Sequence, residues 1–119
     1  MHEVSMIKKI LELTLRQIEE HHAESASVIR ISMAVSDHLN DSGAQSLFSS
    51  LAAHTAAKHA QLAIHWNPAV YRCVACGEQI SSLAFVPYMD CPVCGKMAMP
   101  GPQTHEWSLD EIVLEGGAE

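Results

Sequence analysis

Aromatic residues, long apolar runs and, in one part of the chain, positive charges are all scarce. Aromatics make up 5% of the 119 residues while 48% are hydrophobic, so a core must be built mainly from aliphatic side chains. No stretch approaches about 18 consecutive apolar residues, which argues against a membrane-spanning helix. A chain this short buries one modest core, which predicts one small domain with at most a minor second module.

The opening residues also lack a secretory pattern. MHEVSMIKKILELTL interleaves acids and bases and contains no uninterrupted apolar region, so we expect no secretory signal and a cytoplasmic protein. Thiols stay reduced in that compartment, where clustered cysteines usually bind metal.

Lysine and arginine are nearly absent from the second part of the chain. Residues 73–119 contain one base, Lys96, against seven acids, whereas residues 1–72 contain six bases against seven acids. All four cysteines lie in the acidic part. Nucleic-acid phosphates are bound by clustered Lys and Arg. The charge distribution therefore argues against nucleic-acid binding, and a zinc-ribbon adaptor for nucleic acid or protein is kept as the alternative function.

Hydrophobic spacing predicts an α+β fold, with two helices packed on one face of a small β-sheet and an inserted four-cysteine, zinc-ribbon-like module. A final alternating segment, 107–114, predicts a strand that returns to the sheet or packs against the insert. The other predicted elements are a helix over 4–22 with Val4, Ile7, Leu11, Leu15 and Ile18 on its apolar face, a strand over 28–35, a helix over about 43–59 capped by Asp41 or Ser42, and a strand over 62–66 that ends before Pro68.

The four cysteines form two identical hooks, Cys73-Val-Ala-Cys76-Gly and Cys91-Pro-Val-Cys94-Gly. Two residues between thiolates let both reach one ion, and the following glycine permits a left-handed turn. Four thiolates suit a closed, structural Zn²⁺ site with no open position for chemistry. Iron in a rubredoxin-like site, two disulfides and a thioredoxin-like redox pair are the alternatives.

A second candidate metal site is formed by the first three residues. Because an initiator Met is normally removed only before small residues, we expect Met1 to remain in front of His2. Its α-amine, the His2 amide and imidazole, and a donor from Glu3 form fused chelate rings that suit Ni²⁺ or Cu²⁺. The alternative interpretation is a solvated helix entry.

These features together resemble the HypA/HybF family of nickel metallochaperones for [NiFe]-hydrogenase maturation. The Met1-His2-Glu3 opening followed by an amphipathic helix, the strand VIRISMAV, the segment SLFSSLAAHTAAKHAQLAIHWNP, the two hooks and the closing HEWSLDEIVLE are all similar to that family, over nearly the whole chain.

The resemblance implies a nickel-binding domain over 1–70 plus about 103–116, joined by a hinge near Pro68–Arg72 to a zinc-binding domain over 71–102. It implies that Met1, His2 and Glu3 bind transported Ni(II), and that Cys73, Cys76, Cys91 and Cys94 bind structural Zn(II). The protein would then be a carrier and not an enzyme. Its expected partners are the hydrogenase-maturation GTPase and the hydrogenase large-subunit precursor, with urease maturation proteins as a second pathway. We expect a monomer or homodimer that binds neither nucleic acid nor membrane.

Two further features accompany the resemblance. The family usually has a Gly-Glu-Leu-Ser-like turn after its first strand, where this chain has Ser36-Asp37-His38-Leu39, so a partner surface there would differ. His38 and His105, in predicted loops, are the leading candidates for an additional nickel donor. His54 and His59, five residues apart on the predicted helix, do not form a pair, and His65 is predicted to point outward from its strand.

Overall fold

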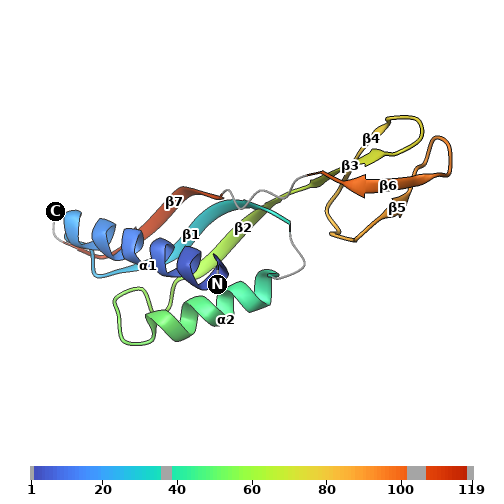
Figure 1. Cartoon of the computed structure of the whole chain (residues 1–119). Helices are drawn as coiled ribbons and strands as arrows, with labels where there is room; N and C mark the ends of the chain where they lie inside the picture. The colour runs from blue at the N-terminus through green and yellow to red at the C-terminus, as the bar shows by residue number, and fades with distance from the viewer. Residues whose placement is uncertain (1, 36–38, 102–106, 118–119) are drawn as a thin grey trace.

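The chain folds into two β-sheets, one of which packs against two helices (Figure 1). The computed structural model describes residues 2–35, 39–101 and 107–117. The elements of the described residues are α1 (His2–Glu20), β1 (Ser25–Ala34), α2 (Asp41–Ala52), β2 (Gln61–Asn67), β3 (Ala69–Cys73), β4 (Gln79–Ser82), β5 (Met89–Asp90), β6 (Met97–Pro100) and β7 (Trp107–Glu115). The predicted α+β class is confirmed.

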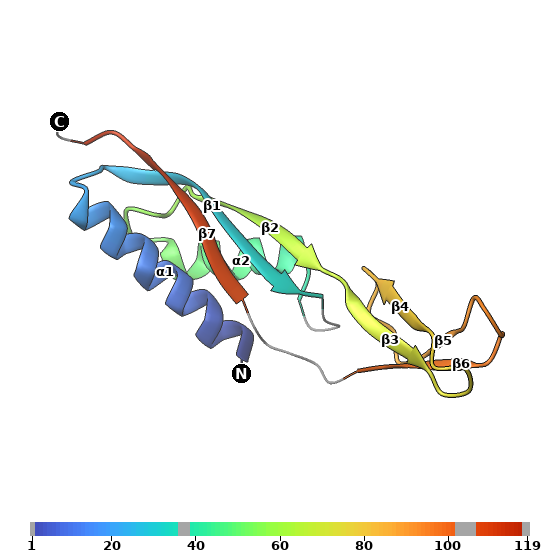
Figure 2. The ribbon, with the colours of Figure 1, turned by 90° about the horizontal axis from the view of Figure 1, so that it is seen from above.

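The first sheet has the strand order β2-β1-β7. Strand β1 pairs in parallel with β2, which is possible because α2 supplies the crossover between them. Strand β7 pairs antiparallel with β1, so the closing segment returns to this sheet and does not pack on the cysteine insert. Figure 2 shows both helices on the same side of the three strands.

The core lies between the helices and β1. The alternating residues Ile29, Ile31 and Met33 of β1 are buried, while Arg30 between them is exposed, as the period-two pattern predicts. The fully or nearly fully buried residues that form one cluster are Ile7, Ile10, Ile18, Ala26, Ile29, Ile31, Met33, Ala44, Phe48, Ala52, Ala57 and Ala60. All of them precede residue 61, so the core belongs to the first sheet and its helices.

Helix α1 ends two residues before the predicted end, at Glu20. The backbone N–H of Ala23 donates to the carbonyl of Ile18 at 2.9 Å, and that of His22 donates to Glu19 at 3.2 Å. This is a Schellman arrangement, in which one residue adopts a left-handed conformation. His22 is that residue, with φ of 53°.

Helix α2 begins at Asp41, two residues before the predicted start, and is shorter than predicted at its C-terminal end. Asn40, and not Asp41 or Ser42, is the N-cap, because its Oδ1 accepts the Gly43 amide at 2.8 Å. The helix ends at Ala52, after which Thr55, Lys58 and Ala60 donate to carbonyls three residues back. His54 and His59 are therefore exposed in successive turns and not on the helix.

The second sheet has the strand order β4-β3-β6-β5, with neighbouring strands antiparallel. Pro68 alone separates β2 from β3, because Ala69–Arg72, part of the expected hinge, already pair with β4. The two sheets lie end to end in a molecule of 60 × 25 × 18 Å (Figure 1). Its radius of gyration is 18.0 Å, compared with about 13.5 Å for a compact domain of this length. Among the described residues, no helix is both long and apolar enough to cross a bilayer.

Candidate metal centre

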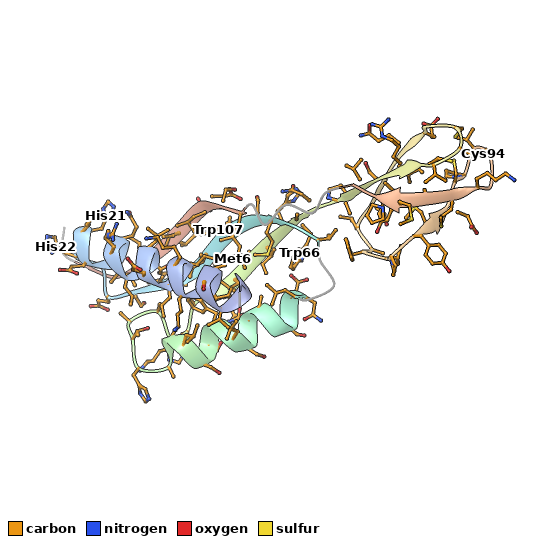
Figure 3. All side chains as sticks on the ribbon, in the orientation of Figure 1. Met6, His21, His22, Trp66, Cys94 and Trp107 are labelled. Carbon is orange, nitrogen blue, oxygen red and sulfur yellow. The ribbon has the colours of Figure 1, made fainter. Side chains whose placement is uncertain are left out.

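The four cysteines come together at the end of the molecule that lies away from the helices. Cys73 ends β3, Cys76 follows in the turn, Cys91 follows β5, and Cys94 precedes β6. Their sulfur atoms all lie within 4.8 Å of one another. Figure 3 shows Cys94 at the opposite end of the molecule from His21 and His22, which lie at the end of α1.

The two hooks share the same backbone geometry. In the first, the N–H of Gly77 donates to the Cys73 carbonyl at 3.1 Å, and in the second, the N–H of Gly95 donates to the Cys91 carbonyl at 2.8 Å. Gly77 has a φ of 78° and Gly95 a φ of 77°, the left-handed conformation that glycine adopts without steric cost. The glycine in each CxxCG motif therefore closes the turn that brings two sulfurs together.

The sulfur positions fit a tetrahedral cation. A zinc–sulfur bond of about 2.3 Å in a tetrahedron separates the sulfurs by about 3.8 Å. The Cys73 and Cys94 sulfurs are 3.4 Å apart, and those of Cys76 and Cys91 are 3.7 Å apart. None of the four cysteines forms a disulfide. Each of these two close pairs joins one hook to the other, as a shared cation requires, whereas a redox disulfide of the CxxC type would join the two cysteines of one hook. The donor set is thus four thiolates, which soft or borderline cations prefer.

Backbone amides tune the acidity of these thiols. The Cys76 N–H, with help from the Ala75 N–H and against burial, lowers the pKa of Cys73 to about 6. A backbone N–H from Glu78 acts on Cys76 in the same direction, but burial and hydrogen bonding among the sulfurs prevail and raise the pKa of Cys76 to about 12. The four sulfurs therefore titrate as a coupled group, and the protons that they retain must be released when a cation binds.

A buried aromatic residue that the sequence analysis did not select supports this site. Tyr71 is fully buried two residues before Cys73. Its hydroxyl donates to the Val86 carbonyl at 2.9 Å and accepts the Val86 N–H at 2.8 Å. It therefore fastens the loop between β4 and β5, which carries the chain from the first hook to the second. The sequence does contain a sign of this role, because Tyr71 is one of few aromatic residues and lies two positions before the first cysteine.

The candidate nickel residues are only partly described. Helix α1 begins at His2, so the backbone of His2 and Glu3 is helical, while Met1 and the side chains of His2 and Glu3 lie outside the described residues. The backbone N–H groups in the first turn of a helix have no intrahelical acceptor.

The other candidate donors do not form a cluster in the described part of the chain. His38 and His105 lie outside the described residues, as do Ser36 and Asp37 of the altered turn. His65 is exposed and lies opposite Ser32 on the outer face of the first sheet, which confirms its predicted outward orientation.

The fold and the thiolate cluster define a class: a small two-part protein with a helix-packed sheet at one end and a four-cysteine metal centre at the other. Residues 1–114 match the family model described as HypA, hydrogenase/urease nickel incorporation, metallochaperone. The chain belongs to the HypA family, which confirms the resemblance.

Individual relatives are similar to this chain over nearly its full length. The hydrogenase maturation factor HypA of Archaeoglobus fulgidus is 32% identical over 115 residues, which cover 97% of this chain and 99% of that protein. The factor of the same name from Desulfitobacterium hafniense is 25% identical over 117 residues, with 97% and 99% covered. The solution structure of the Ni metallochaperone HypA from Helicobacter pylori has the same fold, with a TM-score of 0.56, 19% identity, and 98% and 99% of the two chains covered.

Proposed function

We propose that this chain is a nickel carrier that binds Ni²⁺ at Met1, His2 and Glu3 and delivers it for [NiFe]-hydrogenase maturation. The observation that carries the proposal is the family match, which begins at Met1 and thus includes the Met-His-Glu opening. The start of α1 at His2 adds support, because the His2 and Glu3 amides need no intrahelical acceptor there. Nitrogen-rich donor sets suit Ni²⁺, and a site at a chain terminus, as a class of site, permits both uptake and release.

The proposal includes a resident Zn²⁺ on Cys73, Cys76, Cys91 and Cys94. The sulfur separations support this assignment. Bound zinc supplies no reaction chemistry here, because four thiolates leave no open coordination position, and it holds the two hooks together. We also propose the division that the family resemblance implies, into a nickel-binding domain over 1–70 plus about 103–116 and a zinc-binding domain over 71–102. Strand β3 starts near that division, at Ala69.

The same proposal makes the protein a non-enzymatic, cytoplasmic carrier. Its partners are the hydrogenase-maturation GTPase and the large-subunit precursor, with urease maturation proteins as a second pathway, and neither nucleic acid nor membrane takes part. Nickel selectivity cannot come from affinity alone, because Cu²⁺ binds more tightly than Ni²⁺ at most nitrogen donors, so geometry and metal supply must provide it.

The nickel site is tested by titrating Ni²⁺ into the zinc-loaded protein, into His2→Ala, and into a form with residues added before Met1. We expect both changes to abolish tight binding, because each removes part of the chelate. His59→Ala is the matched control, since His59 is exposed and far along the chain from the opening residues. If the extended form and His2→Ala bind nickel as tightly as the native protein, the terminal site is wrong. Acidification through about pH 6.5 should also weaken binding, because the imidazole must be neutral.

A further inference from the structure

The four-stranded sheet has one covered face and one open face. Tyr71, Cys73 and Ala98 point to the covered face and are buried. The strand register places the neighbouring side chains together on the opposite face, where all of them are exposed. The side chains on this open face are those of Val70, Arg72, Gln79, Ser81, Asp90, Met97 and Met99.

The open face carries three large apolar side chains that are exposed. Val70, Met97 and Met99 are 43%, 45% and 41% exposed. The other large hydrophobic side chains that are exposed in the described residues, Val74, Leu83, Tyr88 and Val93, lie in the turns and loops of the same unit, whereas the outer face of the first sheet is polar. Exposed apolar surface concentrated in one place usually marks an interaction site, and methionine and arginine are enriched in protein interfaces.

A cavity of about 390 Å³ lies at the root of the open face, where the two sheets meet. Ala34 at the end of β1 and Val35 after it line one side of the cavity. The second sheet and its connections contribute the rest of the lining, namely Pro68, Ala69, Val70, Arg72, Gln79, Phe85, Pro100 and Gly101. A cavity of this size accommodates a large apolar side chain together with a neighbouring polar group. It is continuous with the open face, because Val70, Arg72 and Gln79 belong to both.

Arg72 and Gln79 supply the polar groups of the cavity, directly opposite each other in the β3–β4 register. Within the described residues, neither side chain forms a hydrogen bond, and Arg72 forms no ion pair with any carboxylate. A guanidinium and a carboxamide in apolar surroundings are complementary to a carboxylate.

We propose that the open face and its cavity bind an extended segment of a partner protein, with an apolar side chain in the cavity and an adjacent carboxylate on Arg72. A small carboxylic acid would fill the cavity but leave Met97 and Met99 uncovered, whereas a polypeptide covers both. This goes beyond the proposed function, which assigns no residue of this chain to partner binding.

The test uses the zinc-loaded full chain and an array of immobilised pentapeptides whose two central positions carry every pair of amino acids. We expect the bound peptides to combine Asp or Glu with a neighbouring aliphatic or aromatic residue. For these peptides Arg72→Gln should weaken binding about tenfold and remove the preference for acid over amide. Met99→Ser should weaken binding and keep that preference. Lys58→Gln, which removes an exposed positive charge from the turns between α2 and β2, should change neither.

Zinc content, measured for each variant, shows that the sheet has kept its fold. Binding of no peptide, or an unchanged preference for acid in Arg72→Gln, would overturn the proposal. Displacement of the peptides by hexanoate at concentrations comparable to their own would also overturn it, because the cavity would then be a small-molecule site. Nickel plays no part in the assay, so its failure leaves nickel delivery standing, and failure of the nickel titration leaves this docking site standing.

Discussion

The two ends of the molecule are stabilised in different ways. The helix-packed sheet has a continuous core of aliphatic side chains and Phe48, all from residues 7–60. In the described part of the unit built on the four-stranded sheet, the buried residues are Tyr71, Ala98 and two of the cysteines, Cys73 and Cys91. Units with so little apolar burial usually need a metal or disulfides. The difference indicates that a cation does for the second sheet what hydrophobic packing does for the first.

Removing the metal should break this comparison most strongly. Structural zinc contributes about 10–16 kcal/mol of apparent binding free energy, which in such a site is folding free energy. We expect Cys91→Ser, or a strong chelator, to remove amide hydrogen-exchange protection throughout β3–β6 and to leave β1 protected. The measurement is residue-resolved hydrogen exchange together with metal content, which should be one zinc per chain before treatment.

Restoring zinc after chelation is the matched control and should restore protection. If the second sheet remains protected without metal, side-chain packing alone holds it and the contrast between the two ends is wrong.

The opposite test removes packing and leaves the metal in place. Phe48 is fully buried in the first core, so Phe48→Ala should lower the free energy of unfolding of the helical unit by about 3–5 kcal/mol through lost burial and a cavity. Zinc content should not change. Denaturant unfolding of the zinc-loaded protein, followed by helical circular dichroism, measures the effect.

Leu83→Ala provides the comparison for that substitution. Leu83 is 66% exposed in the second sheet's loop, so its truncation should change stability by no more than about 0.5 kcal/mol. Equal losses in the two variants would show that the units do not differ in their dependence on packing.

A smaller effect is expected where the second sheet does use a buried side chain. Tyr71→Phe removes the hydroxyl that satisfies both backbone groups of Val86, which should cost about 1–3 kcal/mol of local stability. Faster exchange of the Val86 amide with unchanged exchange in β1 is the expected signature. Tyr88→Phe is the control, because Tyr88 is 61% exposed. Equal exchange rates in the two variants would show that the Tyr71 hydroxyl does not hold the loop.

The sequence predicted which helices and strands form better than it predicted the residues at which they begin and end. Alternation located β1, and the CxxCG spacing predicted the cysteine cluster, because each depends on near neighbours in the chain. Helix α1 contacts both the sheet and α2, so its buried face is wider than one predicted stripe. It includes Ile10 and Thr14, and the hydroxyl of Thr14 is satisfied by the Ile10 carbonyl at 2.8 Å. A polar residue satisfied in this way could not be recognised as core from hydropathy.

Other features depended on contacts between distant segments. No glycine or proline marks the end of α2, and the turns after Ala52 form because Ala57 and Ala60 are buried in the core. The parallel pairing of β1 with β2 and the pairing of β3 with β6 involve residues separated by long stretches of sequence. The cavity beside Arg72 depends on how the two sheets meet, which no local pattern encodes.

The two sheets also differ in the side chains on their solvent-exposed faces. Where the second sheet exposes methionines, the first carries a polar network in which Asp110 accepts hydrogen bonds from Ser32 and from Ser108, the latter at 2.9 Å. Ser32, then Ser108, with His65 nearby, lower the pKa of Asp110. A carboxyl group whose pKa is lowered by folding stabilises the protein at pH values above the ordinary pKa of Asp, about 3.9. That stabilisation is lost as the pH falls through the pKa of the folded state.

Ser32→Ala should therefore raise the pKa of Asp110 toward its ordinary value, because the carboxylate loses its leading donor. The change is measured by following the Asp110 side-chain carboxyl by ¹³C NMR during acid titration, and the effect on global stability should be the smallest of those predicted here, since the site is exposed. Ser27→Ala is the matched control, because Ser27 donates to the Val113 carbonyl on the same pair of strands and not to Asp110. An Asp110 pKa that is the same in both variants would mean that Ser32 does not lower the pKa of Asp110. The polar side chains on the outer face of the first sheet would then not act as a hydrogen-bonded network.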